Sequence, residues 1–148
     1  MKIIITEQQY TLIKEDSLKQ SLLDNIKEFG VIDTINMVGD FDILCQLLNI
    51  ESPMDFLHLF DDLEQVQSEQ HKDLILFRYK PNNNYMVYNT KNKEVYINNH
   101  EIWSFLKSNF GLNHQEIQGL TKEWLDEVYK LRGVTTSEIH VSTLRRVG

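Results

Sequence analysis

The stretch Leu74-Ile-Leu-Phe-Arg-Tyr-Lys-Pro-Asn-Asn-Asn-Tyr-Met-Val-Tyr-Asn-Thr-Lys-Asn-Lys-Glu-Val-Tyr-Ile-Asn98 decides the fold of this chain. It contains three short runs rich in aromatic and β-branched residues, which are Leu74–Lys80, Tyr85–Asn89 and Glu94–Asn98. Asparagine-rich segments with turn-forming composition separate the runs. This pattern predicts an antiparallel meander of three strands.

Helical spacing precedes the meander. Thr6 followed by Gln9 is typical of a helix start, and Lys2–Thr6 reads as a short strand before it. A second helical pattern follows, with one apolar stripe that Gly30 would end. The stripe consists of Leu18, Leu22, Leu23, Ile26 and Phe29.

Residues 31–48 admit two interpretations. As helices, 31–38 would end at Gly39, and Asp40 would cap a second helix over 41–48. As strands, the same residues would form two β runs with a turn at Gly39 and Asp40. The apolar spacing fits a period of 3.6 better than a period of 2, which favours helices.

Three further helices are predicted. Ser52-Pro53-Met54-Asp55 is a cap followed by proline at the first helical position, and the apolar spacing extends that helix to about Val66. Asn98 or Asn99 would cap a helix over 101–109. Asn113 with Glu116 would start another that reaches about Leu131 and ends at Gly133.

The predicted fold class is α+β, in a single domain over 1–148. It comprises a mainly helical acidic part (1–66), the β-meander (74–98), two C-terminal helices (99–132) and an edge strand or tail (134–148). A chain of 148 residues can bury one core of ordinary size.

Charge is unevenly distributed along the chain. Val31 to Asp73 holds ten carboxylates and one lysine, whereas Leu74 to His100 has a net charge of +3, in a chain of net charge −7. An acidic chain has little general affinity for phosphate backbones, so nucleic acid is an unfavoured partner.

The location of the chain is predicted to be cytoplasmic. The N-terminus has three consecutive apolar residues, against about seven or more in a signal peptide. No window approaches the roughly 18 apolar residues of a membrane span, so we expect no membrane contact. The single Cys45 excludes an internal disulfide and lies in an apolar run, which favours a buried, inert thiol.

The sequence matches catalytic motifs only weakly. Asp40-Phe41-Asp42 resembles a Mg²⁺-holding pair of carboxylates, but no Gly-Ser accompanies it, and an N-cap role explains Asp40. No two histidines have metal-ligand spacing, and no glycine-rich phosphate loop occurs. We therefore expect no cofactor, no metal site and no catalytic residues, and an enzyme is the less favoured interpretation.

Two surfaces are candidates for binding. The acidic block suggests charge-steered docking onto a basic protein, with four carboxylates as the candidate contacts: Asp55, Asp61, Asp62 and Glu64. The alternative is single-stranded nucleic acid bound by basic and aromatic residues of the meander, which are Arg78, Lys80, Tyr85 and Tyr88.

Two resemblances add expectations. Segments 1–10, 34–39 and 101–105 are similar to parts of small uncharacterised proteins of tailed bacteriophages, which implies an accessory protein acting on a host protein in the bacterial cytoplasm. Gly30-Val31, Val38-Gly-Asp-Phe-Asp42 and Asp55-Phe-Leu57 resemble the ligand-sensing α/β domain of leucine-responsive regulators. The second likeness implies strands at 31–48 and a small-ligand site.

Overall fold

The computed structural model describes residues 7–79 and 84–139, with their side chains from residue 17 onward. The chain divides into two compact units, Met1–Glu51 and Ser52–Gly148. The strand predicted at Lys2–Thr6 and the segment 140–148 lie outside the described residues.

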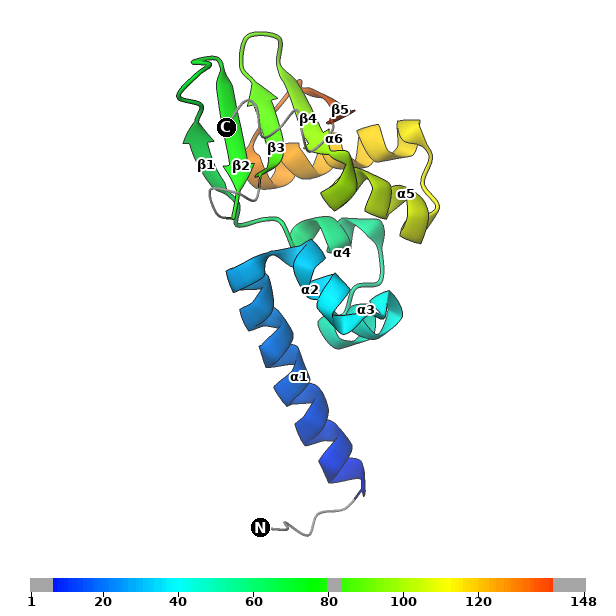
Figure 1. The fold of residues 1–148 in the computed structure, drawn as a ribbon. Coiled ribbons are helices and arrows are strands. Elements are labelled where there is room, and N and C mark those ends of the chain that lie inside the picture. The colour runs from blue at the N-terminus through cyan, green and yellow to red at the C-terminus, as the bar shows by residue number, and fades with distance from the viewer. Residues whose placement is uncertain (1–6, 80–83, 140–148) are drawn as a thin grey trace. The chain divides into compact units, whose positions relative to one another are not determined.

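The first unit consists of helices α1 (Glu7–Phe29), α2 (Val31–Val38) and α3 (Phe41–Leu48) (Figure 1). The two helical patterns predicted before Gly30 are one continuous helix, α1, because no helix-breaking residue separates them. Its buried stripe includes Leu22 and Ile26, which are each 6% exposed. Gly30 then adopts a φ of 91° and separates α1 from α2.

The helical interpretation of residues 31–48 is confirmed, and the strand interpretation is wrong. Gly39 ends α2 in the left-handed conformation at a φ of 76°. The Asp40 carboxylate accepts hydrogen bonds from the backbone N–H groups of Asp42 and Ile43, at 3.0 and 3.2 Å. A stop and a cap therefore meet at one turn, and this local chemistry selects two short helices over a hairpin.

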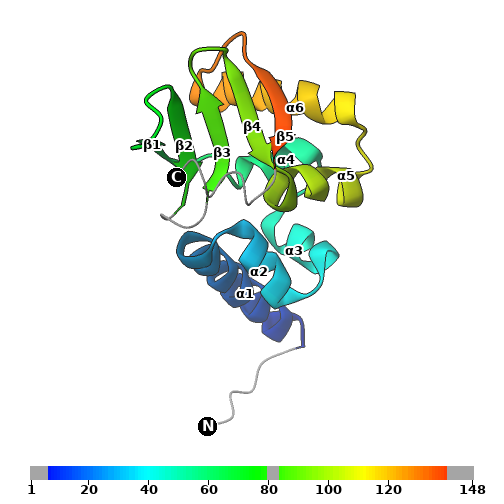
Figure 2. The same ribbon diagram turned by 45° about the horizontal axis from the view of Figure 1, so that its top comes forward.

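The second unit begins with α4 (Pro53–His58), β1 (Glu64–Gln67), β2 (Leu74–Arg78), β3 (Asn84–Asn89) and β4 (Glu94–Asn98). The π-helix η1 (Asn99–Trp103), α5 (Ser104–Phe110), α6 (His114–Tyr129) and β5 (Thr135–Ile139) follow. The α+β class is thereby confirmed. Figure 2 shows the strands of this unit side by side with helices behind them.

The sheet contains five strands in the described residues, in the order β1-β2-β3-β4-β5, and so extends beyond the predicted three-stranded meander. Strand β5 lies at the sheet edge, within the segment 134–148 where an edge strand or tail is predicted. Strands β2, β3 and β4 form the expected antiparallel meander. Strand β1 pairs antiparallel with β2, and β5 pairs parallel with β4. The parallel pair requires a crossover connection, which η1, α5 and α6 supply.

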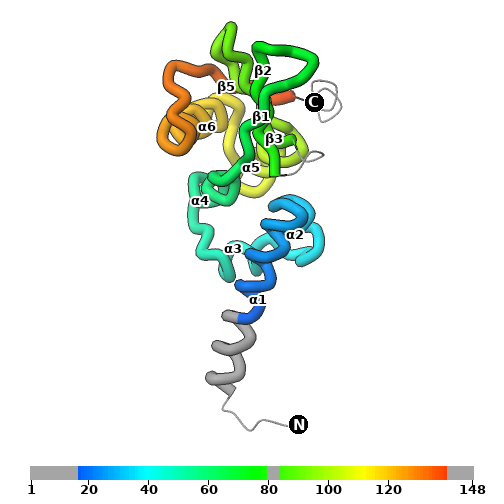
Figure 3. Tube along the Cα trace, turned by 90° about the vertical axis from the view of Figure 1, so that its left-hand side faces the viewer, coloured from blue at the N-terminus to red at the C-terminus, as the bar shows by residue number. Residues whose placement is uncertain are grey.

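The helical layer covers one face of the sheet. Figure 3 gives a side view in which α6 stands to one side of the strands. Cross-strand partners Phe77, Met86 and Ile97 are each 0% exposed and form an apolar row across β2, β3 and β4. Trp124 of α6 is likewise 0% exposed. The core of this unit therefore lies between the sheet and the helices.

Two predicted helix ends are wrong. The helix that starts at Ser52 ends at His58, and Val66 lies in strand β1. Helix α6 ends at Tyr129, followed by Lys130 in the left-handed conformation at a φ of 59°, and not at Gly133. Gly119 neither kinks nor divides α6, which runs unbroken over 16 residues.

Candidate functional site

The predicted protein-binding residue Asp55 has a local structural role. The Ser52 hydroxyl accepts a hydrogen bond from the Asp55 backbone N–H at 3.2 Å, and the Asp55 carboxylate accepts one from the Ser52 backbone N–H at 3.1 Å. This reciprocal pair is a capping box at the start of α4. The carboxylate therefore helps to hold the start of α4.

Asp61 also bonds within the second unit. Its Oδ1 accepts a hydrogen bond from the Trp124 indole N–H at 2.8 Å, and its Oδ2 lies 2.9 Å from His58 Nδ1. The Asp61 and His58 side chains are 32% and 37% exposed, so water screens their ion pair. The bond to Trp124 connects the segment after α4 to α6 across 63 positions of sequence.

Two tyrosines bind the backbone of the same segment. The Tyr79 hydroxyl donates to the Leu59 carbonyl and the Tyr129 hydroxyl donates to the Phe60 carbonyl, while Tyr129 accepts from the Leu63 N–H at 3.1 Å. Burial raises the pKa of both phenols well above 10, and the nearby Asp61 and Asp62 charges raise each pKa further. Both phenols are therefore neutral and donate their hydrogen bonds to backbone carbonyls just after the end of α4 at His58.

The remaining two acidic candidates differ in their surroundings. Glu64 Oε2 lies 3.4 Å from Arg78 Nε across the β1–β2 pair, so part of the acidic block pairs with the basic stretch that follows it. Asp62 is exposed. The structure does not bring the four predicted carboxylates together as one free acidic face, since three of them have partners within the unit.

One of the two tyrosines proposed to stack on nucleic-acid bases is buried. Tyr85 is 2% exposed, and its ring lies 5.1 Å from Phe60 and 5.4 Å from Tyr79, centroid to centroid. A buried ring cannot stack on a base. Tyr88 is half-buried, and Lys80 lies outside the described residues.

Nothing in the described residues supports a metal site or a reactive nucleophile. Asp40 is the N-cap of α3, as expected, and Asp42 is exposed in its first turn. No group of three His, Cys, Asp or Glu side chains able to hold a metal ion occurs within 17–79 and 84–139. Cys45 is half-buried rather than buried, and burial, followed by the Asp42 charge, raises its pKa, which keeps the thiol protonated and unreactive.

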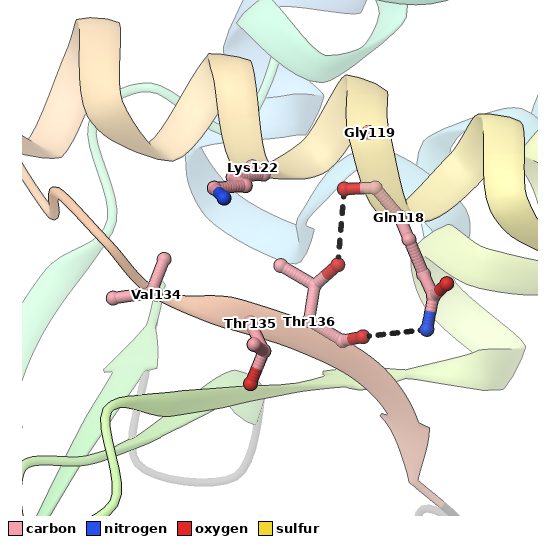
Figure 4. A pocket seen from close by; sticks show the side chains of 6 residues that line it. All are labelled: Gln118, Gly119, Lys122, Val134, Thr135 and Thr136. Atoms are coloured by element: carbon pink, nitrogen blue, oxygen red, sulfur yellow. Dashed lines mark hydrogen bonds between the residues drawn. The ribbon is translucent and has the colours of Figure 1, made fainter.

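An open cavity of about 200 Å³ lies between α6 and β5, at a place that the sequence pattern did not indicate. Figure 4 shows its lining, in which Thr136 Oγ1 donates to the Gln118 carbonyl and Gln118 Nε2 donates to the Thr136 carbonyl, both at 3.1 Å. Lys122 brings the one formal charge of the lining. These hydrogen bonds join helix to strand, and the lining holds no paired acid and base for catalysis.

A second surface missed in the sequence lies on the first unit. The large apolar side chains that the described residues leave exposed all belong to α1, α2 and α3: Leu18, Phe29, Met37 and Ile43, at 43%, 42%, 58% and 47%. Met37 and Ile43 fall off the apolar stripes that predict α2 and α3. Their position off these stripes is the sequence feature that indicates exposed apolar side chains.

Comparison with known proteins adds no relative: no family model matches the chain, and neither a curated protein nor a solved structure shows significant similarity to it. Among the described residues, none of the helices combines the length and apolarity needed to span a membrane.

Proposed function

We propose that this chain is a non-enzymatic protein-binding module that docks a basic partner through an acidic surface. The observation that carries the proposal is the confinement of exposed large apolar side chains to the first unit, within 17–51, while the described part of the second unit exposes none. Exposed apolar groups that gather on one part of a protein are typical of interaction surfaces.

Charge supports the same surface. The segment Met1–Glu51 has nine carboxylates against four lysines, a net charge of −5 out of −7 for the chain. Between Lys27 and Lys72 the sequence contains no lysine or arginine. A surface of one sign attracts partners of the other sign and raises their rate of association.

The acidic contacts therefore shift from the predicted set toward α2 and α3. Asp33 and Asp42 are exposed in the first turns of these helices. Of the four residues first proposed, Asp62 is exposed, but it belongs to the second unit, whose described part exposes no large apolar side chain. The resemblance to small proteins of tailed bacteriophages makes a bacterial host protein, met in the host cytoplasm, the proposed partner.

Affinity capture from bacterial lysate tests this function. The tagged full chain should retain a discrete set of proteins at 0.05 M salt and release most of them at 0.5 M, because salt screens the steering charge. The double variant Asp33→Asn with Asp42→Asn should retain less, and the matched variant Asp62→Asn should retain as much as the wild type. Retention no greater than that of the tag alone contradicts the proposal.

A further inference from the structure

Helix α3 has more apolar surface than its own unit buries. Six of its eight residues are apolar, and of these only Leu44 is fully buried, at 0% exposure. Four others are half-buried, and Ile43 is 47% exposed. A helix that packed fully within its unit would bury one continuous stripe instead.

The unburied apolar positions follow the helix. Ile43 and Leu47 are four residues apart, so they lie on one side of α3, one above the other. Leu47 adjoins the buried Leu44 on the helix surface, since helical neighbours three and four apart share a face. The exposed strip is thus an extension of the packed face toward solvent.

Acidic groups surround the N-terminal end of this strip. The first turn of α3 holds Asp42, and Asp40 caps it. Neither α2 nor α3 contains a lysine or arginine. An apolar strip on a helix whose charged side chains are all carboxylates is complementary to apolar side chains flanked by lysine or arginine.

The backbone of α3 is paired within the helix, which excludes recognition by strand addition. A partner must bind through side chains while satisfying its own backbone groups, and a helix does both. We infer that α3 docks a basic amphipathic helix, with Ile43 and Leu47 contacting its apolar face and Asp42 its basic flank. This inference rests on the proposed function and names the class of partner and the contact residues.

The test uses the full chain and a synthetic probe. The probe is an 18-residue fluorescein-labelled peptide of leucine and lysine, with leucine at helical spacing, and binding is read as fluorescence anisotropy. One control peptide replaces every lysine by glutamate. A second control keeps the composition but places leucine and lysine in an order without helical spacing.

The expected result is saturable binding of the leucine–lysine helix and much weaker binding of both controls. Ile43→Gln should weaken binding roughly five- to tenfold, because about half of an isoleucine side chain remains to be buried. Asp42→Asn should weaken binding and reduce its salt dependence. Leu112→Gln removes a half-buried apolar side chain from the second unit and should leave binding unchanged. Circular dichroism of each variant verifies that its helices are intact.

The outcomes separate the two proposals. Equal affinity for the glutamate peptide overturns the charge complementarity, and equal effects of Ile43→Gln and Leu112→Gln overturn the assignment to α3. Failure of the probe to bind, with capture from lysate still successful, overturns the helical partner and leaves the proposed function standing. Failure of both measurements overturns the proposed function as well.

Discussion

Replacing Asp61 with alanine removes the acceptor of the Trp124 indole N–H, a hydrogen bond of 2.8 Å. Trp124 is 0% exposed, so the freed indole donor belongs to a buried side chain. A buried donor left without a partner costs about 1–3 kcal/mol. The ion pair with His58 adds little, because about a third of each side chain is exposed. We expect Asp61→Ala to lower the free energy of unfolding of the second unit by about 2 kcal/mol.

Urea denaturation followed by tryptophan fluorescence measures this loss. Both tryptophans, Trp103 and Trp124, belong to the second unit, so the signal reports on that unit alone. Asp62→Ala is the matched control, and it should change the free energy of unfolding by less than about 0.5 kcal/mol because Asp62 is exposed. Asp61→Asn keeps an oxygen that can accept the indole hydrogen bond and should recover at least half of the loss. Equal losses for Asp61→Ala and Asp62→Ala refute the structural role of Asp61.

Two more predictions concern the second unit. The raised pKa values of Tyr79 and Tyr129 mean that the folded state keeps protons which the unfolded state loses near pH 10, so this contribution to stability is complete below pH 10 and declines above it. The free energy of unfolding should decline by up to about 1.4 kcal/mol per pH unit for each tyrosine. The decline should be shallower in the double variant Tyr79→Phe with Tyr129→Phe, as measured by urea denaturation between pH 8 and pH 11.5. An unchanged slope in the double variant contradicts the prediction. Gly119→Ala should raise the free energy of unfolding by about 0.5–1 kcal/mol, since nothing lies within 4 Å of the added Cβ in mid-helix, whereas Gly111→Ala, at a φ of +66°, should lower it. Thermal denaturation compares the two variants, and a loss of stability in Gly119→Ala would count against the helix geometry.

Local signals in the sequence predicted the elements whose ends are decided locally. Asp40 and the Ser52–Asp55 pair are caps that the structure confirms, as is the pair of Asn113 with Glu116. Each cap joins residues two or three positions apart, so the information needed to recognise it lies within one turn of sequence.

The missed elements depend on distant partners. Strand β1 continues a helical apolar spacing, and the helix stops at His58 where hydroxyls from Tyr79 and Tyr129 bind the carbonyls of Leu59 and Phe60. Both tyrosines are at least 20 positions away. The parallel pairing of β5 with β4 is equally nonlocal, because η1, α5 and α6 separate the two strands in the sequence.

The candidate site was predictable in its charge but not in its position. The excess of carboxylates between Val31 and Asp73 is a property of composition, and so it is visible in sequence. Whether a carboxylate is free depends on folding: Asp61 meets Trp124, and Glu64 meets Arg78. Because these two carboxylates have partners, the proposed contact residues lie on α2 and α3 instead.

Site-specific photo-crosslinking in bacterial lysate locates the docking surface on the chain itself. A benzophenone-bearing amino acid replaces Ile43 on α3 in one protein and the exposed Asp62 of the second unit in another. We expect a discrete cross-linked partner from position 43 and none from position 62. Addition of the leucine–lysine peptide should abolish the cross-link from position 43. Cross-linking from position 62 with none from position 43 would contradict docking on α3.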